Sequence, residues 1–114
     1  MARNAIPDPL ERRHLVEKAL PAAQALAIAE AYLAQDRCVE AIDFLRIAKA
    51  DERLDELRER ALTDGDAFLM RAVAGAQRRP PTREEWQRIG TNAAALGRDR
   101  YALEARRQVE RGDD

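Results

Sequence analysis

Short helical segments separated by tight breaks are the feature that most constrains the fold of this 114-residue chain. Apolar residues recur at helical spacing over about three turns at a time, and each stretch stops at a turn of about two to four residues. Helices this short depend on packing against neighbours. The sequence therefore predicts an all-α protein of about seven short antiparallel helices, covering roughly residues 9–20, 22–35, 38–49, 52–62, 66–78, 83–97 and 99–111.

Capping residues place several of these helix ends. Thr82 and Glu85 have the spacing of a capping box, in which each side chain satisfies the other's backbone amide. Asp8 precedes a proline at the first helical position, and Asp51 stands where it could cap the helix that follows. Gly112 has the place of a C-terminal cap.

The helical spacing also predicts the core of one domain over residues 1–114. The helix at 22–35 carries apolar residues on several sides, so we expect it to have little solvent face. The residues expected to face inward are Ala22, Ala25, Leu26, Ala29, Tyr32, Leu33, Val39, Ala41, Ile42, Leu45, Ala48, Leu54, Leu57, Ala61, Leu62, Phe68, Leu69, Ala72, Val73 and Ala76.

Composition removes many kinds of chemistry. The chain has no Ser, one His and one Cys, so serine nucleophiles are excluded and the His/Cys ligand set for a metal is poor; we expect neither catalysis, nor a cofactor, nor a metal. Interleaved charges with a net value of −1 argue against nucleic acid as a partner. The most apolar stretch, Ala22 to Ala34, is too short to span a bilayer, and a single cysteine suggests no oxidising compartment, so a cytoplasmic location is expected.

Three polar features could still carry a function. His14 could sense pH or bind a metal, but a lone His is more typical of an ordinary surface residue. Cys38 stands at a helix start, where its thiol could be reactive, but no His lies nearby to act as a base. Arg78, Arg79 and Arg83 could touch an anion, although a solvated linker is the simpler interpretation. Surface ion pairs are expected for Glu56–Arg60, Glu84–Arg88, Arg100–Glu104 and Arg106–Glu110.

Two segments share one spacing of large and small residues. The later segment has Trp86, Ile89-Gly90, Ala93, Gly97 and Ala102. The earlier one, shifted by 61 residues, has Ile28-Ala29, Tyr32, Asp36, Ala41, Leu45 and Ala48. This pattern resembles the tetratricopeptide repeat, in which small residues let two paired helices cross closely and large ones fill the remaining space. Ala93 replaces the usual Tyr, and Ala25 stands where a Trp is expected.

The resemblance implies stacked helix pairs at about 22–50 and 83–111, with an irregular pair at 51–79 between them. It also implies a non-enzymatic scaffold whose groove receives a protein, a peptide or a partner helix. Alternatives are a helical module that dimerises with a second copy of itself, or a domain of a larger protein. The first helix of each pair lines the groove in that family, which points to Leu26, Glu30, Leu33, Ala34, Glu84, Gln87, Arg88, Thr91 and Ala95.

Overall fold

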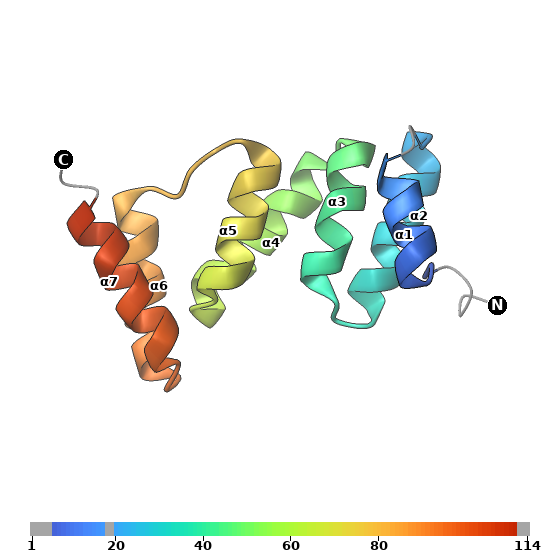
Figure 1. The fold of residues 1–114 in the computed structure, drawn as a ribbon. Coiled ribbons are helices and arrows are strands. Elements are labelled where there is room, and N and C mark those ends of the chain that lie inside the picture. The colour runs from blue at the N-terminus through green and yellow to red at the C-terminus, as the bar shows by residue number, and fades with distance from the viewer. Residues whose placement is uncertain (1–5, 18–19, 112–114) are drawn as a thin grey trace. The chain divides into compact units, whose positions relative to one another are not determined.

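The computed structural model describes residues 6–17 and 20–111, and all regular structure within these ranges is α-helical (Figure 1). The prediction of an all-α chain with seven helices is confirmed for this part of the chain. None of these helices is long and apolar enough to cross a membrane. The helices are α1 (Pro9–Glu17), α2 (Ala22–Ala34), α3 (Cys38–Ala48), α4 (Asp51–Asp64), α5 (Ala67–Gln77), α6 (Arg83–Ala95) and α7 (Asp99–Arg111).

Side-chain caps fix three helix starts. The Glu11 amide donates to Asp8 Oδ1 at 2.8 Å, and the Leu69 amide donates to Asp66 Oδ1 at 2.9 Å. At the start of α6 the capping box predicted for Thr82 is present. Asp51 was wrongly predicted as a cap, because it is already the first residue of α4. The cap predicted at Gly112 lies outside the described residues.

One kind of turn closes five of the helices. Asp36, Lys49, Gly65, Arg78 and Gly97 all adopt the left-handed conformation, with φ between 53° and 75°. The amide of each donates to the carbonyl three residues earlier, and the next amide reaches back five residues. This is the Schellman arrangement, which satisfies carbonyls left open at a helix end. In four of the five cases the next helix begins two residues after the left-handed one.

The chain divides into two compact units, Met1–Leu54 and Asp55–Asp114, with the boundary inside α4. In the first unit α2 packs against α3, and α1 also contacts α3. The rings of Tyr32 and Phe44 stack with centroids 5.8 Å apart in its core. The Arg12 guanidinium of α1 lies over both rings and donates to the Glu40 carbonyl at 2.8 Å.

Arg37 also lies over the ring of Tyr32, with its guanidinium carbon 4.9 Å from the ring centroid. Arg37 also makes a bidentate pair with Glu40, which lowers the pKa of that carboxyl and raises the pKa of Arg37. Among the described residues, the buried Tyr32 hydroxyl has no hydrogen-bond partner. The core of the first unit therefore contains an aromatic pair that two guanidinium groups contact.

In the second unit α6 packs against α7, and α5 also contacts α7, where Arg71 pairs with Glu104. Gly65 is buried in the turn after α4, and a Cβ added there would lie 2.4 Å from the backbone nitrogen of Ala93. The turn between α4 and α5 therefore touches the α6 backbone directly, and only glycine fits at this point.

Most of the predicted core is buried, but some inward assignments are wrong. Phe68 is 52% exposed and Val39 is also exposed, while their helices bury Met70 and Phe44, which were not predicted. Ala22 and Leu26 are exposed, and α2 has a substantial solvent face. The apolar residues of these helices lie on nearly all of their sides, so helical spacing alone could not identify the buried side. Leu33, Ala48, Ala72 and Ala76 are only half-buried.

Candidate functional site

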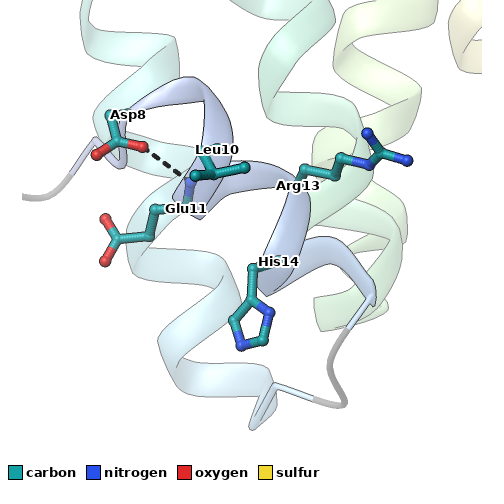
Figure 2. Close-up of a pocket in the computed structure, with 5 residues that line it drawn as sticks. All are labelled: Asp8, Leu10, Glu11, Arg13 and His14. Carbon is teal, nitrogen blue, oxygen red and sulfur yellow. Dashed lines mark hydrogen bonds between the residues drawn. The ribbon is translucent and has the colours of Figure 1, made fainter.

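One pocket, with a volume of about 530 Å³, lies along α1. Its lining consists of Asp8, Leu10, Glu11, Arg13 and His14, all from one short segment. Figure 2 shows these side chains fanning outward from the helix instead of converging on a point. Leu10 is 80% exposed, so this is an open helix surface that offers a ligand few simultaneous contacts.

A second pocket of about 520 Å³ lies on the α6–α7 hairpin, and both helices contribute to it. We call it the α6–α7 pocket. Its lining residues are Trp86, Gln87, Gly90, Thr91, Ala94, Ala102, Arg106 and Val109. Because two helices form its walls and one aromatic residue belongs to its lining, this pocket is the better candidate for binding.

Small residues create the α6–α7 pocket. Gly90 lies so close to α7 that a Cβ added to it would be 3.4 Å from the Cβ of Ala105. Ala94 and Ala102 leave further space on the two helices. Arg106 is exposed and makes no ion pair within the described part of the chain, so its charge is available to a ligand.

The opposite side of α6 is fixed to α4. Arg88 donates to both carboxylate oxygens of Glu59, at 3.3 and 2.5 Å, which lowers the pKa of Glu59 and raises the pKa of Arg88. Asn92 donates from Nδ2 to the Leu62 carbonyl at 2.7 Å. These contacts orient α6 so that Gln87 and Thr91 lie in the pocket.

The start of α6 is fixed by a buried ion pair that the sequence did not reveal. Arg58 of α4 is only 4% exposed and makes a bidentate pair with Glu85, with distances of 2.9 and 2.7 Å. It also donates to Gln77 Oε1 and to the carbonyls of Arg79 and Pro80. The hydrogen bond from Arg58, helped by the Thr82 amide, lowers the pKa of Glu85 to about 2.

The nine predicted groove residues are divided between the two units. Leu26, Glu30, Leu33 and Ala34 belong to the first unit and the other five to the second. In the first unit the Glu30 carboxylate is engaged by Arg53, with distances of 2.8 and 2.7 Å.

In the second unit Gln87 and Thr91 line the α6–α7 pocket, whereas Glu84, Arg88 and Ala95 do not. The remaining lining residues were not predicted as groove residues. The repeat spacing had marked Trp86, Gly90 and Ala102, but as packing positions.

The other singled-out polar residues have local roles. Cys38 is buried at the start of α3, with Sγ 4.0 Å from Asp36 Oδ1. In the linker Arg79 pairs with Asp55 at 3.1 Å. Within the described residues, no three His, Cys, Asp or Glu side chains gather where they could hold a metal ion.

Three of the predicted surface pairs differ in the structure. Arg88 pairs with Glu59 instead of Glu84, and Glu104 pairs with Arg71 instead of Arg100. No ion pair joins Arg106 to Glu110 among the described residues. In the first two cases contacts between helices replace pairs along one helix.

Comparisons with known proteins do not assign the chain. No protein-family model, no curated protein and no solved structure matches it.

Proposed function

We propose that this chain is a non-enzymatic protein-interaction module built from tetratricopeptide-like helix pairs, and that the α6–α7 pocket holds its partner. The observation that carries the proposal is a pocket of about 520 Å³ between two helices, with a largely small and apolar lining. Exposed apolar hollows of this kind are typical of surfaces that bind other proteins.

The repeat-like part of the proposal is supported by the turns. The left-handed residues Asp36, Gly65 and Gly97 each join two consecutive helices with the same hydrogen-bond pattern. They lie 29 and 32 residues apart, an interval typical of helix-pair repeats.

Site-specific photo-crosslinking tests the proposed binding face. A benzophenone amino acid is placed at Gln87 or at Thr91, which line the pocket, and the tagged chain is irradiated in cells of its source. Mass spectrometry then identifies the adducts. We expect one protein to be captured from both positions.

Glu84 and Ala95 provide matched controls, because both are exposed on α6 but neither lines the pocket. They should yield little of that adduct. Equal capture from all four positions, or no protein shared by Gln87 and Thr91, would contradict the assignment of the pocket as the binding face.

A further inference from the structure

The three helix pairs can be aligned on their left-handed turn residues, Asp36, Gly65 and Gly97. Six residues before each of these stands Glu30 in α2, Glu59 in α4 and Thr91 in α6. The first two positions make the same kind of contact. Glu30 is bound by Arg53 of α4, and Glu59 is bound by Arg88 of α6.

In both cases the arginine comes from the first helix of the following pair. Arg53 reaches Glu30 at 2.7 Å, and Arg88 reaches Glu59 at 2.5 Å. The glutamate at this position therefore pairs with an arginine of the next helix twice along the chain. Thr91 has the equivalent place in the third pair and lines the α6–α7 pocket.

Burial of the second helix of each pair agrees with this alignment. Five residues after the turn residue, Ala41 and Met70 are fully buried, and nine residues after it, Leu45 and Ala74 are buried. The equivalents in α7 are Ala102, which is half-buried, and Arg106, which is exposed. These two positions are thus buried in the first two pairs and more exposed in the third.

We propose that the α6–α7 pocket receives an acidic amphipathic helix from a partner protein, at the place where Glu30 and Glu59 of the first two pairs bind an arginine of the next helix. This inference rests on the proposed function and names the partner's chemistry. The helix supplies an apolar stripe for Trp86 and the small residues, as in helix-in-groove recognition.

The charged residues of the α6–α7 pocket indicate which charge a partner helix carries there. The carboxylate that receives an arginine in the first two pairs is replaced by the uncharged Thr91, and the buried Leu45 and Ala74 are replaced by Arg106. Compared with the equivalent positions of the first two pairs, the α6–α7 pocket therefore lacks an acceptor for arginine and carries a cation. A helix with a carboxylate at this point is complementary, whereas one with an arginine is repelled.

Two peptides test this proposal. The first is the sequence of α4, Asp51–Asp64, which already carries six carboxylates and three arginines on an amphipathic helix. The second is the same peptide with Arg53→Glu, and both are capped at their ends. Trp86 is the only tryptophan of the chain and lines the pocket, so its fluorescence reports binding during titration to about 1 mM peptide.

We expect the Arg53→Glu peptide to bind the protein about three- to tenfold more tightly than the unchanged peptide, because a repulsion becomes an attraction. Thr91→Glu in the protein should reverse this order, since it restores the acceptor that Glu30 provides in the first unit. Arg106→Glu should remove the preference, while Arg107→Glu, a change at an exposed neighbour that does not line the pocket, should leave it intact.

Equal effects of Arg106→Glu and Arg107→Glu would overturn the proposal, as would no fluorescence change with either peptide. A peptide that binds by displacing the protein's own α4 would bind equally well to the Arg106→Glu protein. That result would also count against the proposal. Concentration-dependent Trp86 fluorescence without peptide, together with a dimer in light scattering, would assign the pocket to a second copy. If crosslinking at Gln87 and Thr91 succeeds while the peptides fail, only the acidic-helix inference falls.

Discussion

Arg58 is the side chain whose replacement should damage the second unit most. Its guanidinium is almost fully buried and donates to Glu85, Gln77 and two backbone carbonyls of the linker before α6. Arg58→Met keeps most of the side-chain volume and removes every one of these donors. Glu85 then remains as a partly buried carboxylate without its main counter-charge.

The pKa of Glu85 gives the size of the effect. A fall from 4.5 to about 2 corresponds to about 3 kcal/mol of interaction favouring the charged carboxylate. Removing one partner of a buried ion pair costs about 3–5 kcal/mol in general. We therefore expect Arg58→Met to lower the free energy of unfolding of the second unit by about 3 kcal/mol.

Urea unfolding followed by Trp86 fluorescence measures this loss, because the only tryptophan belongs to the second unit. Arg60→Met is the matched control, since Arg60 lies on the same helix but pairs with Asp64 at the surface. That change should cost less than about 1 kcal/mol. A loss below about 1 kcal/mol for Arg58→Met would refute the assigned role of Arg58.

The same ion pair predicts a pH dependence. The folded pKa of Glu85 is depressed, so its contribution is complete above the unfolded value of 4.5 and is lost as the pH falls toward about 2. The wild-type protein should lose stability across this window. Glu85→Gln should reduce the dependence of the free energy of unfolding on pH, as followed by Trp86 fluorescence. Identical pH profiles for the two proteins would show that Arg58 and Glu85 are not coupled in solution.

Four further substitutions test the turns and the core of the first unit. Gly65→Ala should cost about 2–4 kcal/mol in urea unfolding because its Cβ meets the Ala93 backbone, whereas Gly97→Ala, with open space around it, should cost only about 1 kcal/mol. Tyr32→Phe should leave stability unchanged or raise it by up to about 1 kcal/mol, since the buried hydroxyl has no hydrogen-bond partner within the described part of the chain; a clear loss would reveal one. Lys49→Gly should raise the melting temperature, because glycine accepts the left-handed conformation without strain, and a decrease would count against this view of the turn.

The helices could be predicted because their signals are local. Thr82 and Glu85 are three residues apart, and their capping box depends on no other part of the chain. Breaks such as Asp36-Arg37 also carry a short-range signal. Which side of an apolar helix is buried has no such local signal, because it depends on the neighbouring helices. Phe68 and Val39 were misassigned for that reason.

The candidate site was predicted only in part because it depends on relations between helices. Arg58 resembles the other charged residues of α4 in sequence, and only the arrangement of α4 with the linker and Glu85 buries it. Gln87 and Thr91 were expected to face a partner because of a family resemblance along one helix. The contribution of α7 to the pocket, above all Arg106, required the α6–α7 hairpin itself.

The most direct test of the account is an NMR titration of the isotope-labelled chain with the partner captured by crosslinking. The Trp86 indole and the Gly90 amide are distinctive signals inside the α6–α7 pocket. We predict that both signals shift as partner is added, while the amides of α2 and α3 do not. Shifts that gather on α2, with Trp86 and Gly90 unchanged, would contradict the claim that this pocket is the binding face.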